Sequence, residues 1–206
     1  MRLVPRLLSA LPLLALVVTS GDAVPDPANS IVEPVIVGNA TGNALGAPGE
    51  IGTSAVPGYE VVVRNVINLP EPGALVVLDF SATSIRLFTV QSPGTTVDCA
   101  RRVLAKATGA NGLALFTPRF GGYENANLVR VFADGVFLAN VQARSTDIDA
   151  LGGRTGLGDL TLFANNFYAN PLAPETDFDL NGTTGLGDLF IFAREFVAPG
   201  EGTYCP

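Results

Sequence analysis

The chain contains no histidine, no tryptophan and a single lysine, Lys106. Without histidine it cannot use a Ser-His-Asp or Cys-His catalytic group, a histidine-ligated zinc site or an imidazole proton shuttle near neutral pH. The lack of tryptophan weakens the case for sugar stacking. A formal net charge of −7 also removes the basic footprint that nucleic-acid binding requires. The sequence therefore excludes several common enzyme classes and indicates no nucleic-acid partner.

The composition indicates a folded protein with many turns. Of the 206 residues, 48% are hydrophobic and only 15% are charged, which suffices for a packed core in one domain or two small ones. Glycine (23 residues) and proline (15 residues) are frequent but not periodic, which is typical of short strands and turns rather than of collagen.

The N-terminal segment has the pattern of a secretory signal peptide. Arg2 and Arg6 precede an apolar run over residues 7–18, and small residues follow up to Ala23. A membrane anchor is the alternative, but this run is shorter than the roughly 20 residues that a spanning helix needs. We therefore expect cleavage of residues 1–23, a secreted or cell-surface protein and no membrane span after cleavage, which the mass of the secreted chain would test.

Export bears on the two cysteines, Cys99 and Cys205, because disulfides persist in oxidising compartments. One intramolecular bond is possible. In the chain-entropy description, closing a loop of about a hundred residues stabilises a protein by roughly 4–5 kcal/mol. Unpaired thiols and pairing between two chains are the alternatives.

Charge divides the remaining chain in two. Residues 24–144 carry nine acidic and eight basic side chains, whereas residues 145–206 carry nine acidic and two basic ones. Such an asymmetry marks a boundary between two regions with different partners. Concentrated negative charge in a folded segment favours a bound cation.

Residues 24–58 are rich in proline, glycine, asparagine and alanine and are expected to form a linker. Within it, residues 31–37 can form a strand, and Pro34 favours an edge position because proline donates no hydrogen bond to a sheet. Residues 59–144 show alternating or continuously apolar runs bounded by turn residues. The expected strands are 59–67, 74–80, 85–91, 101–107, 113–120, 128–133 and 136–143.

Two dipeptides, Asn111-Gly112 and Asp134-Gly135, are typical of tight hairpin turns. Short strands without an intervening helix predict a mainly β fold, an antiparallel β-sandwich. The stretches 73–78 (GALVVL) and 107–116 (ATGANGLALF) resemble bacterial Ig-like domains of the invasin and adhesin type. This resemblance implies an Ig-like sandwich over residues 59–144 that serves as a spacer or binding platform.

The C-terminal region contains an internal repeat. Residues 155–164 (TGLGDLTLFA) and 184–193 (TGLGDLFIFA) match at an offset of 29 residues, with eight of ten positions identical, which indicates a tandem duplication. Apolar residues at helical spacing predict helices over residues 157–168 and 186–197. The phenylalanines expected to pack between these helices are Phe163, Phe167, Phe192 and Phe196.

The second loop (residues 177–188), which begins ahead of the second copy and runs into it, carries oxygen-bearing side chains at EF-hand spacing. Ca²⁺ takes six to eight oxygen ligands, and Gly182 at loop position 6 permits the sharp turn that such a loop needs. The last position holds aspartate where an EF-hand has glutamate. The expected calcium ligands are Asp177, Asp179, Asn181, the carbonyl group of Thr183, and Asp188.

The first loop (residues 147–159) is a degenerate copy. Asp147 and Asp149 match positions 1 and 3, but the loop is one residue longer, so Asp159 falls at position 13. The counterpart of the asparagine is missing, and Arg154 adds a positive charge. We expect this loop to bind calcium more weakly than the second loop, or not at all.

The two loop–helix units resemble a dockerin, the two-repeat calcium module of secreted bacterial proteins. The resemblance places such a module within residues 145–206 and implies calcium as the ligand and a cohesin-like or cell-surface domain as the partner. In that family, loop positions 10 and 11 help to recognise the partner. Helix entry and core contact are the alternative roles for these positions, which here are Leu157, Gly158, Leu186 and Gly187.

Three functions are compatible with these patterns. The first, which we expect, is a secreted non-catalytic protein in which an Ig-like spacer precedes a calcium-binding module for docking or surface attachment. The second is a carbohydrate-active enzyme or a carbohydrate-binding fragment, because dockerins often accompany such enzymes and two carboxylates can suffice for glycoside cleavage. The third is a structural surface protein whose loops bind no calcium. Acidic residues of the 59–144 region, which show no paired motif, are Glu60, Glu71, Asp79, Asp98, Glu124 and Asp134.

Overall fold

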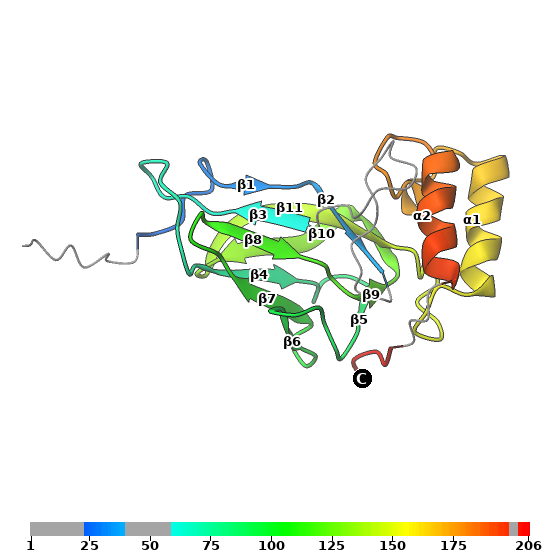
Figure 1. Cartoon of the computed structure of the whole chain (residues 1–206), viewed down its shortest axis with the longest axis horizontal. Helices are drawn as coiled ribbons and strands as arrows, with labels where there is room; N and C mark the ends of the chain where they lie inside the picture. Colours follow the sequence, from blue (N-terminus) through cyan, green and yellow to red (C-terminus); the bar gives the residue numbers. More distant parts are fainter. Residues whose placement is uncertain (1–22, 40–58, 198–201) are drawn as a thin grey trace, which may run out of the picture.

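The structure is a computed structural model that describes residues 23–39, 59–197 and 202–206. It consists of a β region (residues 23–39 and 59–145) followed by a two-helix module (residues 146–197), as Figure 1 shows. The expected signal peptide, apart from Ala23, and residues 40–58 of the expected linker lie outside the described residues. Of the helices within the described ranges, none combines the length and the apolar character that crossing a bilayer requires.

The largest part of the β region is a curled, mixed sheet of six strands. Their spatial order is β2 (Val35–Gly38), β11 (Val136–Ser145), β10 (Tyr123–Ala133), β4 (Leu75–Asp79), β7 (Val103–Ala107) and β6 (Thr96–Asp98). The sequence predicted antiparallel pairing throughout, but β2 pairs with β11 in parallel. This pairing is possible because β2 comes from the N-terminal segment and is not joined to β11 by a hairpin.

Two smaller sheets complete the β region. One contains β1 (Ile31–Val32), β3 (Tyr59–Val62) and β8 (Leu113–Phe116), and the other contains β5 (Arg86–Leu87) and β9 (Phe120–Gly121). Buried side chains of the three-stranded and six-stranded sheets belong to one hydrophobic cluster. The core of the β region is therefore shared between these two sheets.

Several expected strands are shorter or divided. Pro34 interrupts residues 31–37, so β1 and β2 become edge strands of different sheets, which confirms the expected edge position. Residues 113–120 divide into β8 and β9 around Pro118. The short polar strand β6 was not expected.

The two glycine-containing turns behave differently. Asp134 (φ 46°) and Gly135 (φ 79°) both have positive φ and join β10 to β11, as a two-residue hairpin requires. At the other turn only Gly112 has positive φ, and the turn connects β7 to β8, which lie in different sheets. The hairpin predicted there is wrong, because a local dipeptide signals a chain reversal but not the strands that pair.

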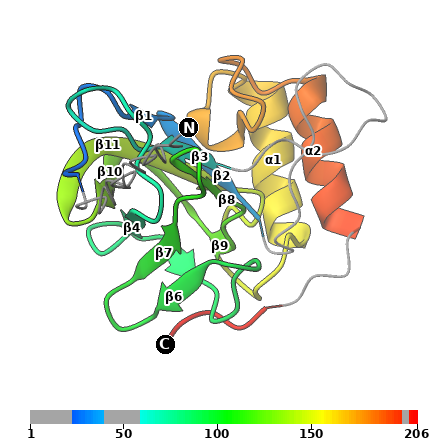
Figure 2. The same cartoon turned by 60° about the vertical axis from the view of Figure 1, so that its left-hand side comes forward.

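The two-helix module contains α1 (Leu157–Ala169), the short 3-10 helix η1 (Pro174–Thr176) and α2 (Leu186–Val197), which confirms both expected helices. Figure 2 shows α1 and α2 side by side, next to the β region. Phe163 and Phe192 are buried, with ring centroids 4.8 Å apart. Phe167 and Phe196 are partly buried against the same cluster.

The buried face of each helix includes an aspartate as well as the expected phenylalanines. In α1 the buried residues are Asp159, Phe163 and Asn166, whereas Leu157 is exposed. In α2, likewise, Asp188 is buried. Each helix therefore turns a carboxylate of its first turn inwards, and hydrophobic spacing alone does not reveal this.

Residues 202–206 return from the two-helix module to the β region. Cys205 forms a disulfide with Cys99, 106 residues away, and its backbone N–H donates to the carbonyl oxygen of Leu87 at 2.7 Å. The intramolecular pairing considered from the sequence is thus present. A disulfide of this kind is consistent with an oxidising compartment.

Phe163→Ala should destabilise the two-helix module strongly, because its ring contacts Phe167, Phe178 and Phe192. Truncation of a buried phenylalanine costs about 3–5 kcal/mol. Phe190→Ala is the matched control, since Phe190 is 45% exposed on α2. Urea denaturation of both variants measures the difference, and equal destabilisation would contradict this packing.

Candidate metal centre

Three aspartates converge in each of the two loops, which end in the first turn of α1 and of α2. Within each cluster, one carboxylate oxygen from every aspartate lies within 4.8 Å of the others. The structure therefore brings together all the carboxylates that the sequence singled out in both loops. The first triad is Asp147, Asp149 and Asp159, and the second triad is Asp177, Asp179 and Asp188.

The same hydrogen bonds fix the last aspartate of both triads. Asp159 accepts the backbone N–H groups of Asp149 and Gly156 at 2.9 and 2.7 Å. Its counterpart Asp188 accepts the equivalent N–H groups, from Asp179 and Gly185, at the same distances. Each carboxylate thereby ties its loop to the N-terminal turn of a helix, where the helix dipole also favours negative charge.

A pair of threonine hydroxyls closes each loop as well. Thr155 donates to Thr146 at 2.9 Å, and the hydroxyls of Thr176 and Thr184 lie 2.6 Å apart. All four residues are buried. Thr155 and Thr184 begin the two copies of the sequence repeat, so the repeat itself carries a signal for this pair that EF-hand numbering overlooks.

The additional residue of the first loop does not separate its carboxylates. Gly152 (φ 75°) and Gly153 (φ 68°) both adopt positive φ there, whereas the second loop turns at Gly182 (φ 91°). Two adjacent glycines with positive φ allow the backbone to turn sharply enough to accommodate the additional residue. The triad of the first loop therefore converges within the same 4.8 Å limit as that of the second loop.

Burial opposes ionisation of these aspartates. Burial, opposed by a hydrogen bond from Tyr204 and reinforced by the charges of Asp159 and Asp149, raises the pKa of Asp147 to about 7. Burial also raises the pKa values of Asp159, Asp179 and Asp188. At neutral pH each triad thus gathers carboxylates that burial and mutual repulsion disfavour, and a bound cation would remove that repulsion.

The donor atoms fit a hard cation. Within the described residues, Oδ1 of Asp147 is buried and accepts no hydrogen bond. Such an unpaired oxygen costs roughly 1–3 kcal/mol or more, and a metal ion would supply its missing partner. Both triads offer only carboxylate oxygens, which suit Ca²⁺ or Mg²⁺ better than Zn²⁺.

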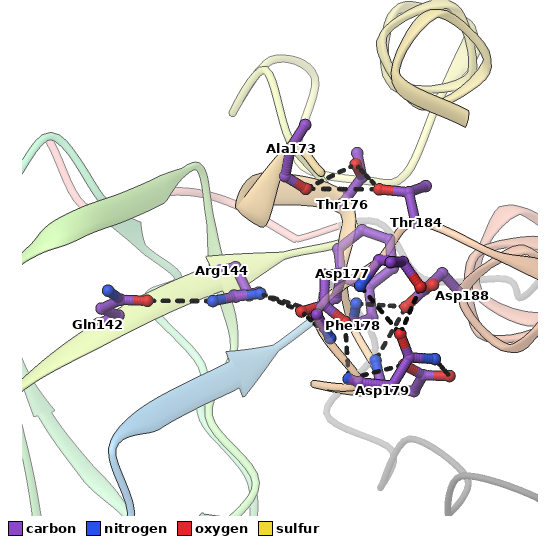
Figure 3. A network of polar contacts seen from close by, with 12 residues as sticks. Gln142, Arg144, Ala173, Thr176, Asp177, Phe178, Asp179, Thr184 and Asp188 are labelled. Carbon is purple, nitrogen blue, oxygen red and sulfur yellow. Dashed lines mark hydrogen bonds and ion pairs between the residues drawn. The ribbon is translucent and has the colours of Figure 1, made fainter. Parts of the chain in front are cut away.

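The first aspartate of each loop contacts a side chain that sequence reasoning missed. Arg144, at the end of β11, donates to the carbonyl oxygen of Asp177 at 2.7 Å and to its Oδ2 at 3.4 Å, as Figure 3 shows. Tyr204 donates its hydroxyl to Oδ2 of Asp147. These contacts span 33 and 57 residues, so no local pattern could have revealed them.

The remaining expected ligands of the second loop lie at its exposed rim. The side-chain amide of Asn181 donates to Oδ2 of Asp179 at 3.0 Å, and its Oδ1 accepts the backbone N–H of Thr183 at 2.9 Å. Asn181 therefore lies next to the second triad and helps to shape the loop.

The four positions expected to contact a partner divide into two kinds. Leu157 and Leu186 are 75% and 76% exposed, so core contact is wrong as an explanation for them. A Cβ atom at Gly158 would clash with the carboxylate of Asp149, and one at Gly187 would clash with that of Asp179. These glycines thus have a role in the triads that requires no partner.

Acidic residues of the β region stabilise local structure. Asp79 forms an ion pair with Arg130 on the neighbouring strand. The side chain of Asp134 accepts the backbone N–H of Leu75 at 2.8 Å, and Glu124 accepts that of Leu128 at 2.8 Å. Each of these carboxylates has a structural partner.

Comparisons with protein-family models, with curated proteins and with solved structures give no match for this chain. The geometry therefore carries the assignment. It defines a mainly β region followed by a two-helix module whose two buried aspartate triads can hold a metal ion.

Stability without a cation should depend on pH through Asp147. Its pKa is about 7 in the folded chain and about 3.9 in an unfolded chain. Protonated Asp147 therefore stabilises the fold below about pH 4, and this contribution is lost as the pH rises towards 7. In chelator, Asp147→Asn should gain stability relative to the original chain between about pH 5 and pH 7.5. Urea denaturation of both chains at the two pH values tests this. The same difference in unfolding free energy between the chains at both pH values would contradict it.

Proposed function

We propose that this protein is exported and non-catalytic, and that its two-helix module is a dockerin-like unit that binds calcium in both loops. In this proposal the module attaches the β region, a spacer or binding platform of Ig-like character, to a partner domain or a cell surface. The observation that carries it is the pair of buried aspartate triads in equivalent positions at the start of two repeated helices.

Calcium is favoured among hard cations by the kind of loop that holds the triads. Each loop reaches its cation position with carboxylates from both its first and last residues, and carbonyl oxygens lie between them in the chain. Ca²⁺ accepts such flexible, many-oxygen environments, whereas Mg²⁺ demands a near-ideal octahedron and retains water. The histidine-free, oxygen-only donor set argues against zinc.

Attachment to a partner is supported by the apolar side chains next to the loops. Leu157 and Leu186 are the first residues of α1 and α2 and are mostly exposed. A loop ordered by calcium would hold each leucine in a defined position, because Asp159 and Asp188 join loop and helix. Calcium would thus control the shape of the surface that carries them.

Calcium binding should show a stoichiometry of two per chain in isothermal titration, with affinities of roughly 10⁻⁴–10⁻³ M typical of extracellular modules. Asp147→Asn and Asp177→Asn should each remove one site, and calcium should raise the melting temperature less in either variant. Glu60→Gln, which removes a charge from β3, is the control and should leave both sites intact. The original chain showing no response at millimolar calcium would contradict the proposal.

Docking should depend on calcium and on the two exposed leucines. The double variant Leu157→Asp with Leu186→Asp keeps both triads, so its calcium isotherm should stay unchanged while calcium-dependent retention on the surface of the source cells falls at least about tenfold, as expected for apolar anchors in an interface. Sedimentation with washed cells, with and without chelator, measures retention. Equal retention of the variant would remove these leucines from the docking surface.

A further inference from the structure

The C-terminal segment (residues 202–206) packs as a strap between the first loop and β5. The N–H of Gly202 donates to the carbonyl oxygen of Gly153 at 3.0 Å, and that of Thr89 donates to the carbonyl oxygen of Thr203 at 2.9 Å. The Cys99–Cys205 disulfide fixes the far end of the strap to the β region. Figure 2 shows this segment running below the helices towards β6.

Tyr204 is held in this strap by contacts on its ring and on its hydroxyl. The ring centroid lies 4.6 Å from that of Phe88, and the guanidinium carbon of Arg86 lies 4.2 Å above the ring. The hydroxyl donates to Oδ2 of Asp147. A Cβ atom at Gly121 in β9 would clash with this hydroxyl, so the glycine leaves the space that it occupies.

The contact with Tyr204 has a direct effect on the first triad. Asp147 is fully buried, and its Oδ2 is engaged by Tyr204, whereas its Oδ1 accepts no hydrogen bond from the described residues. A carboxylate with one oxygen fixed presents the other in a defined direction. Hydrogen bonds of this kind orient metal ligands, and their loss typically lowers metal affinity about 10- to 100-fold.

We infer that Tyr204 is a positioning residue of the first cation site, and that the Cys99–Cys205 disulfide supports this site by holding Tyr204 against Asp147. The inference rests on the proposed calcium-binding function. The second triad lacks this dependence, because Asp177 is held by Arg144 from β11. One loop is thus supported by the C-terminal strap and the other by a strand of the β region.

The test uses the full chain in two backgrounds. Asp177→Asn leaves the first loop able to bind calcium, and Asp147→Asn leaves the second. Tyr204→Phe keeps the ring and removes only the hydroxyl. It should weaken calcium binding about 10- to 100-fold in the first background and less than about twofold in the second. Tyr168→Phe, at a residue that is 92% exposed on α1, is the matched control and should change neither isotherm.

A second variant tests the role of the disulfide. Replacing Cys99 and Cys205 together by serine should weaken the first loop selectively, and adding Tyr204→Phe should then have little further effect, because both changes remove the same contact. A merely structural role would lower the melting temperature in chelator without this selectivity for one loop. Circular dichroism in chelator verifies that each variant is folded.

Three results would overturn the inference while leaving calcium binding by the second loop in place. The first is that Tyr204→Phe lowers calcium affinity equally in both backgrounds, and the second is that it causes no loss in the first background. The third is that the chain with Asp177→Asn alone binds no calcium, so that the first loop holds no cation. The absence of calcium binding by the original chain would instead overturn the proposed function, and the inference with it.

Discussion

Burial of carboxylates that also repel one another is the constraint on which the two-helix module depends. Two triads of aspartates are gathered beside the hydrophobic cluster that joins the two helices. Backbone N–H groups at the helix N-termini, Arg144 and Tyr204 each offset part of the negative charge. The remaining charge is the physical reason for proposing a cation in each loop.

This constraint also links the two parts of the chain. The change in charge composition places the boundary between the two regions near residue 144. In the structure, residues near this boundary connect the β region with the two-helix module. Arg144 reaches the second loop, Ser145 donates its hydroxyl to the carbonyl oxygen of Phe120, and Val37 packs against the phenylalanine cluster of the helices. Loop geometry in the two-helix module therefore depends on the position of β2, β9 and β11, and a fragment that begins after residue 145 would lose these supports.

The sequence revealed the features that depend on local patterns. The repeat predicted both helices to within a residue, and EF-hand spacing selected the aspartates that converge. Hydrophobic spacing could not show that Asp159 and Asp188 face inward, because it assumes that the buried face of a helix is apolar. Loop positions alone could not show that the carboxylates of the first loop converge despite its additional residue, because the positive φ values of Gly152 and Gly153 cannot be read from spacing. Strand pairing, such as β2 with β11, and the roles of Arg144 and Tyr204 depend on contacts distant in sequence.

The two side chains that hold the loops from outside, Arg144 and Tyr204, differ in whether they come before or after their loop in the chain. Arg144 precedes Asp177 by 33 residues, whereas Tyr204 follows Asp147 by 57. A chain synthesised from its N-terminus presents every side chain of the second loop, and the arginine that holds it, before Tyr204 has been added. The second loop can therefore close against β11 first, although it comes later in the sequence. The first loop, in contrast, can gain its contact with Tyr204 only after the C-terminal strap has been synthesised, although its own residues come earlier in the chain.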